Sequence, residues 1–426
     1  MTGSPSRRGA GGAWAALAVL IATAQPARPA ETALGVARFD LPAAFEDWTR
    51  REMSDGLLFQ RVYEPSGPRG RKGLAILLVA KPKPASGAFD TAFTQFVRGI
   101  KQVPAEGKPL TAKAGETLDG HPIRIEQRCC RSSDGLRMNA WFVGIAAGGS
   151  EHYLMLLTLQ LERETEKPVR EAFERLVQTY RASKDDRGLA LAPRAGDGGM
   201  DGLYARTETR LMPNAFGGMD FIADQETLLF DKSGLYTTEM PRDGDMAGHC
   251  RTEVTTCGIY ALKGGWLSAN RIDRVEVENQ FGLAKRSSEA FARTKDGIKI
   301  GDRRYATMPP FAEGHRFSGT WSHTFGSSGP TGAVGGTRTL TLSPDGRFTR
   351  ESSTGFSSTG GSIDGGTTVA GHSRRPLQSG RYAVSGFRIT LSDEAGGTES
   401  LSLFAPDRDT DKLLVIGGAN YLKQAK

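Results

Sequence analysis

The chain has 426 residues, and its 55 lysines and arginines exceed its 48 acidic residues by a formal charge of +7. This length predicts two to four domains. A hydrophobic share of 38% together with 54 glycines is typical of a loop-rich globular protein and excludes collagen-like and wholly disordered chains. The positive charge is too small and too dispersed to indicate nucleic-acid binding.

The N-terminus has the pattern of a secretory signal peptide. Two arginines precede an apolar run at residues 13–22, and the small residues Ala22-Thr23-Ala24 follow. We therefore expect a signal peptide over residues 1–24, with cleavage after Ala30 as the alternative. The run is too short to span a bilayer, and no stretch of about eighteen apolar residues follows it. The sequence thus predicts a periplasmic or secreted protein with no transmembrane segment in its mature form.

The four cysteines favour disulfides in an exported protein, because an oxidising compartment preserves them. Cys250 and Cys257 lie close in the sequence, which predicts a local disulfide. A zinc site that includes the adjacent His249 is the alternative, but neither cysteine pair has a CxxC spacing. Cys129 and Cys130 are neighbours, so they are either bonded to each other or free.

Residues 36–183 alternate strand patterns with two helix patterns. Apolar side chains recur at helical intervals from Phe89 to Ile100 and again from Val169 to Tyr180, which predicts two amphipathic helices. Five strand patterns accompany them, at residues 57–63, 74–80, 123–128, 136–146 and 153–161. Hairpin-sized connections between the last three predict an antiparallel sheet on which the helices pack.

The same segment carries features of a known family. These are Phe39-Asp40-Leu41-Pro42 leading to Trp48, a helix from Ala88, the turn Leu118-Asp119-Gly120, three long strands and a closing helix. In this order of elements the segment resembles the PsbP-like α/β/α sandwich of small secreted bacterial proteins, over roughly a third of the chain. The resemblance implies a binding or adaptor role and transfers no functional residue.

The rest of the chain has a different composition and residue pattern. Residues 184–200 are rich in charge, proline and glycine, which predicts a linker. Short alternating runs follow, as expected of hairpins. The Ser/Gly-rich segment at 352–373 is expected to be disordered or a mobile flap.

A duplication is the strongest architectural signal in this half. Four motifs recur in the same order 112 to 122 residues later, and Gly202-Leu203-Tyr204 corresponds to Gly319-Thr320-Trp321. We predict two tandem antiparallel β-barrel-like modules, at residues 201–310 and 316–424. The chain as a whole is predicted to be α+β. The corresponding aromatics should occupy equivalent interior positions, as for Tyr204 with Trp321, Tyr260 with Tyr382 and Tyr305 with Tyr421.

The Gly-x-Trp motif at Trp321, followed by a hairpin meander, resembles a lipocalin-like barrel over residues 317–424, and residues 201–307 share this resemblance less clearly. This resemblance implies that a small apolar ligand enters the barrel mouth. The alternative is a small barrel filled by its own side chains, and we expect this filled state.

Catalytic and metal-binding motifs are missing from the sequence. It contains no GxSxG, no HExxH and no Walker A motif, and its six histidines are scattered. Residues 407–411 mimic the start of a calcium loop, but Lys412 and Gly418 replace the glycine and glutamate that such a loop needs. We therefore predict no catalytic residue, no metal and no cofactor, and the ligand-binding residues stay undefined.

The function expected from these features is binding. We predict an exported, non-enzymatic cell-envelope protein that binds a small apolar or anionic ligand, or an envelope protein as an adaptor. One alternative is a secreted hydrolase whose site only the fold assembles. Another is a structural protein that meets envelope partners through exposed strand edges. The oligomeric state is left open.

Overall fold

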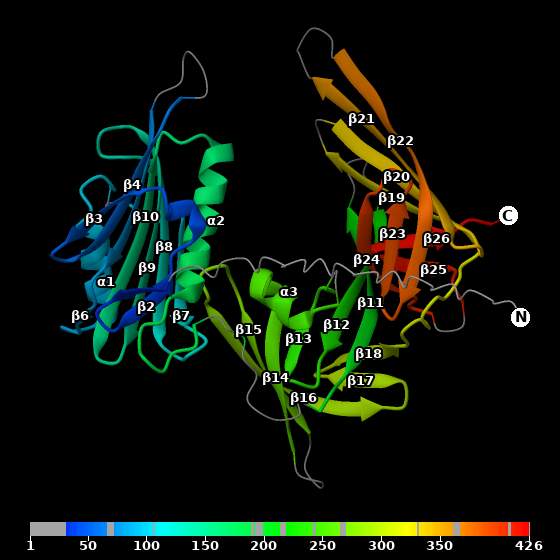
Figure 1. The fold of residues 1–426 in the computed structure, drawn as a ribbon, viewed down its shortest axis with the longest axis horizontal. Helices are drawn as coiled ribbons and strands as arrows, with labels where there is room; N and C mark the ends of the chain where they lie inside the picture. The colour runs from blue at the N-terminus through cyan, green and yellow to red at the C-terminus, as the bar shows by residue number, and fades with distance from the viewer. Residues whose placement is uncertain are drawn as a thin grey trace, which may run out of the picture.

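The computed structural model describes residues 31–65, 72–104, 107–188, 191, 199–213, 219–241, 244–264, 270–329, 332–360, 367–407 and 410–425. The predicted signal peptide lies outside these residues. In chain order the structure comprises a sheet with a helix on each face, a first closed β-barrel and a second closed β-barrel (Figure 1).

The first part is an antiparallel sheet with the strand order β7-β8-β9-β10-β5-β4-β3, and β6 pairs with β10. A separate hairpin of β1 and β2 precedes it. The strands are β1 (Glu31–Leu34), β2 (Ala37–Asp40), β3 (Thr49–Met53), β4 (Gly56–Tyr63), β5 (Gly73–Ala80), β6 (Lys83–Pro84), β7 (Thr111–Glu116), β8 (Pro122–Arg131), β9 (Arg137–Ala147) and β10 (Ser150–Leu159). A short 3-10 helix, η1 (Ala43–Phe45), follows β2.

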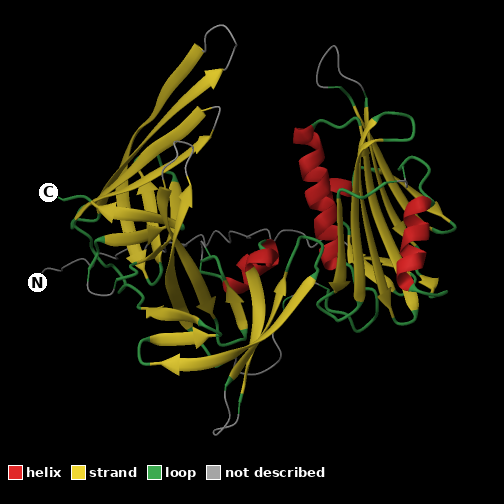
Figure 2. Cartoon of the chain, turned by 180° about the vertical axis from the view of Figure 1, so that it is seen from behind, coloured by secondary structure: helices red, strands yellow, loops and turns green. Residues whose placement is uncertain are grey.

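The two predicted helices are present as α1 (Phe89–Arg98) and α2 (Arg163–Thr179), on opposite sides of this sheet (Figure 2). Successive side chains of a strand point to opposite faces. In β9, Phe142 therefore joins the core under α1, and Val143 joins the core under α2. Phe93 of α1 and Phe173 of α2 lie in these two cores.

The predicted α+β class is wrong, because the protein is mostly β. Over the described residues, strands β1–β26 far outnumber the helical segments. The sequence pattern did not reveal the outer strands β3 and β7, whose residues are all exposed, so no apolar alternation marks them. Backbone hydrogen bonds to β4 and β8 hold both strands in the sheet.

The first barrel runs from β11 to β18 and is closed by the pairings β11–β18 and β15–β16. Its strands are β11 (Gly202–Pro213), β12 (Met219–Phe230), β13 (Leu235–Thr237), β14 (Cys257–Lys263), β15 (Arg271–Val277), β16 (Ala284–Thr294), β17 (Gly297–Ile300) and β18 (Arg303–Met308). Helix α3 (Met246–Thr252) and the 3-10 helix η2 (Val254–Thr256) lie between β13 and β14.

The predicted disulfide between Cys250 and Cys257 is confirmed, and it ties α3 to the start of β14. The zinc alternative is wrong, because both sulfurs are bonded to each other and His249 Nε2 meets the hydroxyl of Thr256 at 3.1 Å. The adjacent Cys129 and Cys130 are bonded to each other as well.

The second barrel is closed by β19 to β26. Its strands are β19 (Gly319–Gly329), β20 (Gly332–Leu342), β21 (Arg347–Gly360), β22 (Thr367–Ser385), β23 (Arg388–Asp393), β24 (Thr398–Phe404), β25 (Leu413–Ile416) and β26 (Ala419–Lys423). The expectation of disorder is wrong for residues 352–360 and 367–373. A continuous backbone ladder between β21 and β22 compensates for their poor strand propensity.

The three parts are joined by packing as well as by the chain. Ala284 of β16 pairs with Glu116 of β7, which makes the first sheet continuous with the first barrel. The two barrels pack through their outer faces, where Leu203 and Phe404 share one apolar cluster. Part of the predicted linker, at 189, 190 and 192–198, lies outside the described residues, so the domain boundaries stay predictions.

Strand register shows that the barrels are two copies of one plan. Tyr204 lies opposite Leu228 on the next strand, as Trp321 lies opposite Leu340. In the last hairpin Tyr305 lies opposite Ile298, as Tyr421 lies opposite Leu414. The predicted aromatic equivalences therefore hold.

The third aromatic pair makes the same hydrogen bonds in both copies. The Tyr260 hydroxyl accepts from the Met200 amide at 3.1 Å and donates to the Asp231 carbonyl at 2.9 Å. The Tyr382 hydroxyl accepts from the Phe317 amide at 2.8 Å and donates to the Ser343 carbonyl at 3.0 Å. Each tyrosine thus fastens the segment before its barrel to the turn between the second and third strands.

Candidate functional site

The second barrel contains a cavity of about 460 Å³. Its apolar wall consists of Leu340, Leu391, Leu401 and Ile416. These side chains are largely buried, whereas the polar residues of the cavity are partly or well exposed. Among the polar residues are Arg338, Arg350, Glu351, Gln378, Glu399 and Tyr421, with Phe325 beside them. The cavity therefore has an apolar interior and a charged mouth.

The first barrel fills the corresponding space with charged side chains. Register equates Arg274 with Leu391, because Tyr260 faces Arg274 and the equivalent Tyr382 faces Leu391. Register likewise equates Glu289 with Leu401, since these residues face the equivalent Ile272 and Ile389. Where the first barrel has an arginine and a glutamate, the second has two leucines.

The charges in the first barrel form one connected network. Arg274, only 8% exposed, pairs with Glu276 at 3.3 Å and with Glu289. Arg303 reaches Glu289 at 3.0 Å and Glu226 at 3.5 Å. Arg206 pairs with Glu226 as well, and with Glu208 at 3.1 Å, so three arginines meet four glutamates. Charged side chains thus occupy, in the first barrel, positions whose counterparts line the cavity in the second, and this cavity overturns the filled state that we expected for the second barrel.

The charges at the mouth of the cavity are only partly paired. Arg350 pairs with Glu399, and its Nε donates to Gln378 Oε1 at 2.6 Å. Glu351 pairs with Arg374. Among the described residues Arg338 makes no ion pair, and its guanidinium lies 5.1 Å from the ring centre of Phe325. Burial raises the pKa of Tyr421, against the opposing charges of Arg338 and Arg350.

Trp321 belongs to the core and not to this cavity. Its side chain is 0% exposed, and its indole N–H donates to the Asp411 carbonyl at 2.7 Å. The Lys423 ammonium lies 4.8 Å from the ring centre and pairs with the Asp411 carboxylate at 2.7 Å. Asp411, the last residue of the sequence that mimics a calcium loop, is thus held by a lysine of β26.

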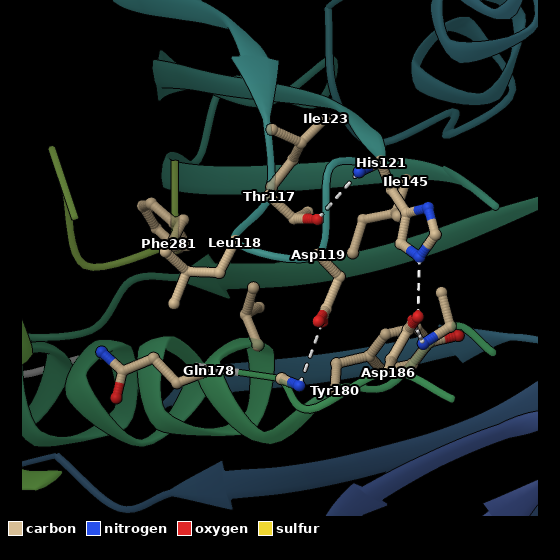
Figure 3. Close-up of a pocket in the computed structure, with 14 residues that line it drawn as sticks. Thr117, Leu118, Asp119, His121, Ile123, Ile145, Gln178, Tyr180, Asp186 and Phe281 are labelled. Atoms are coloured by element: carbon tan, nitrogen blue, oxygen red, sulfur yellow. Dashed lines mark hydrogen bonds and ion pairs between the residues drawn. The ribbon is translucent and has the colours of Figure 1, made fainter. Parts of the chain in front are cut away.

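A second, water-sized cavity of about 20 Å³ lies between the first sheet, α2 and the loop that carries Phe281 (Figure 3). His121 Nε2 lies 2.7 Å from Asp186 Oδ1. The same oxygen accepts the Ser183 hydroxyl at 2.6 Å, and the other oxygen accepts the Ser183 amide at 2.8 Å. Ser183 and His121 therefore both bind Asp186. In a catalytic triad the histidine lies between the serine and the aspartate, so this arrangement cannot activate the serine as a nucleophile. This cluster fastens the chain after α2 to the sheet.

Over the described residues, no group of three or more His, Cys, Asp or Glu residues is arranged to hold a metal ion. No helix in those ranges is both long and apolar enough to cross a bilayer.

Stability is expected to fall as the pH drops from about 6.5 toward about 4, because of His152. This side chain is 0% exposed, and burial lowers its pKa from 6.5 to about 4, despite the nearby charge of Asp186. Between these values the unfolded chain binds a proton that the folded protein does not, so the stability present above pH 6.5 is lost as the pH falls.

Urea unfolding at about pH 7 and about pH 4.5 measures the loss of stability. The contribution of His152 to the difference in free energy of unfolding is expected to be on the order of 2–3 kcal/mol. In His152→Phe that share of the pH dependence should vanish, whereas His372→Gln, at an exposed histidine, should retain it. An identical pH dependence in the parent and His152→Phe would contradict the assignment.

Comparison of the chain with models of known protein families, with curated proteins and with solved structures found no match. Geometry alone therefore identifies the candidate site. The sequence patterns did not reveal the cavity residues. The duplication contains the signal that could have revealed them. When the two modules are aligned on the paired aromatics, Glu226 corresponds to Arg338 and Arg274 corresponds to Leu391.

Proposed function

We propose that the protein binds a small amphipathic ligand in the cavity of the second barrel. The observation that carries this proposal is the replacement of the Arg274 and Glu289 positions of the first barrel by Leu391 and Leu401 in the second. A cavity of about 460 Å³ with an apolar wall and a few polar groups is typical of small-molecule sites. The first barrel then serves as a filled structural copy.

This proposal keeps the predicted role of an exported, non-enzymatic binding protein with a lipocalin-like barrel. Two disulfides are the kind of feature that an oxidising compartment preserves. Export and cell-envelope location remain predictions from the N-terminal residues. The charged mouth favours a ligand with a polar end over a purely apolar one.

Filling the cavity tests the proposal. The double variant Leu391→Arg/Leu401→Glu introduces the pair that fills the first barrel. The full-length parent is expected to bind the neutral probe N-phenyl-1-naphthylamine, with a rise in fluorescence, and the double variant to bind it at least about tenfold more weakly. Leu401→Met, which conserves volume and polarity, should bind the probe like the parent.

Thermal unfolding accompanies each titration, so that loss of binding is separated from loss of fold. If the double variant does not fold, Leu401→Trp fills the same space with an apolar side chain. This variant is also expected to bind the probe more weakly than the parent. Equal probe binding in the parent and in a folded, filled variant would refute the proposed site.

A further inference from the structure

Glu226 in the first barrel is surrounded by donors. Its carboxylate accepts the Tyr305 hydroxyl at 2.5 Å and pairs with Arg206 and Arg303. It is thus the acceptor at which one tyrosine and two arginines converge. Charge-assisted hydrogen bonds of this kind are the strong ones in a protein.

The second barrel keeps part of this arrangement but lacks its acceptor. Glu226 faces Arg206 across the first hairpin, and at the same register Arg338 faces His323. Tyr421 stands where the first barrel has Tyr305. The position of the glutamate is therefore occupied by a cation, next to a tyrosine that can still donate.

The other charges at the mouth do not supply the missing acceptor. Glu399 is engaged by Arg350, and Glu351 is engaged by Arg374. Arg338 has no carboxylate within ion-pair distance among the described residues. One positive charge is therefore left over at the entrance to an apolar cavity.

On the basis of the proposed function, we infer that the ligand carries one anionic head group. This group binds Arg338 and the Tyr421 hydroxyl, and so takes the role that the Glu226 carboxylate has in the first barrel. The apolar body of the ligand lies against Leu340, Leu391 and Ile416. The ligand class is an amphiphile with a single anionic head group, either a carboxylate or a phosphate ester. A second anionic group is disfavoured, because it would meet Glu399 and an arginine that is already neutralised.

Specificity follows from the position of these groups. Arg338 is exposed at the mouth, so an anionic head bound there keeps part of its hydration. A guanidinium binds a carboxylate or a phosphate through two parallel hydrogen bonds, which fixes the head group and aligns the apolar body with the barrel. Arg338 is thus expected to determine the preference for charge, and the leucines the affinity for the chain.

Competition against N-phenyl-1-naphthylamine on the full-length protein tests the inference. The competitors are dodecanoate, dodecyl phosphate and the neutral dodecanol, which share one chain length. With the parent, at least one of the anions should compete roughly tenfold or more better than the alcohol, and the stronger anion identifies the source of the head group. In Arg338→Met the anion and the alcohol should compete about equally well, so that the ratio of their affinities falls to about one. Arg347→Met, at an exposed arginine outside the cavity, should keep the parental ratio.

The outcomes separate this inference from the proposed function. If the probe binds in the cavity but all three competitors act equally on the parent, the head-group inference fails and the ligand site stands. The head-group inference also fails if Arg338→Met keeps the parental preference. If a folded, cavity-filling variant binds the probe like the parent, the proposed function itself fails.

Discussion

Replacing Trp321 with alanine is expected to lower the free energy of unfolding by about 3–5 kcal/mol. The indole is 0% exposed and packs against the ring of Phe317 at a centroid distance of 5.7 Å. Its removal leaves a void in the core of the second barrel and takes away the donor for the Asp411 carbonyl. Urea unfolding followed by circular dichroism measures the change.

The control for this variant is Leu377→Ala in the same barrel. Leu377 is 63% exposed, so its truncation should change the free energy of unfolding by no more than about 0.5 kcal/mol. If Trp321→Ala unfolds like the parent but no longer binds the apolar probe, the tryptophan lines the ligand site, and its assignment to the core is wrong.

Replacing Arg274 with leucine is expected to lower the free energy of unfolding by about 2–4 kcal/mol at neutral pH. The variant keeps Glu276 and Glu289 in the first barrel and removes a buried cation that both of them contact. Both carboxylates are partly buried, so the loss of their shared cation leaves part of their desolvation cost uncompensated.

The second barrel suggests the compensating change. Arg274→Leu/Glu289→Leu reproduces the leucine pair of the second barrel and is expected to recover about 1 kcal/mol or more of the loss, as a double-mutant cycle would show. The control Arg347→Leu removes an exposed arginine and should cost less than about 1 kcal/mol. Equal losses from Arg274→Leu and Arg347→Leu would mean that the network contributes no more than a surface ion pair.

Several elements of the fold follow from local pattern. The helical stripe from Val169 to Tyr180 predicted α2, because one face of a helix must be buried whatever covers it. The duplicated motifs predicted two tandem modules, and Tyr260 and Tyr382 confirm the equivalence through matching hydrogen bonds. The local disulfide was predictable because Cys250 and Cys257 are close in the sequence.

Other elements leave little trace in the sequence. Strands β3 and β7 bury no side chain, so backbone pairing with neighbouring strands defines them. The Ser/Gly-rich strands β21 and β22 have a composition typical of loops, yet their backbone groups are satisfied by each other. The predicted α+β class was wrong for this reason, since it counted only the strands that apolar residues mark.

The sequence by itself determined the alternation of side chains, the two helices, the local disulfide and the duplication, because each depends on residues that are near one another or on motifs that repeat. Only the closed barrels show that charged side chains of the first barrel occupy positions whose counterparts line the cavity of the second. That difference depends on side chains such as Glu226 of β12 and Arg303 of β18, which are far apart in the sequence and meet only when the barrel closes. In the sequence, Leu391 and Arg338 are ordinary strand residues. In the closed barrel both line one cavity, where Leu391 is part of the apolar wall and Arg338 lies at the mouth.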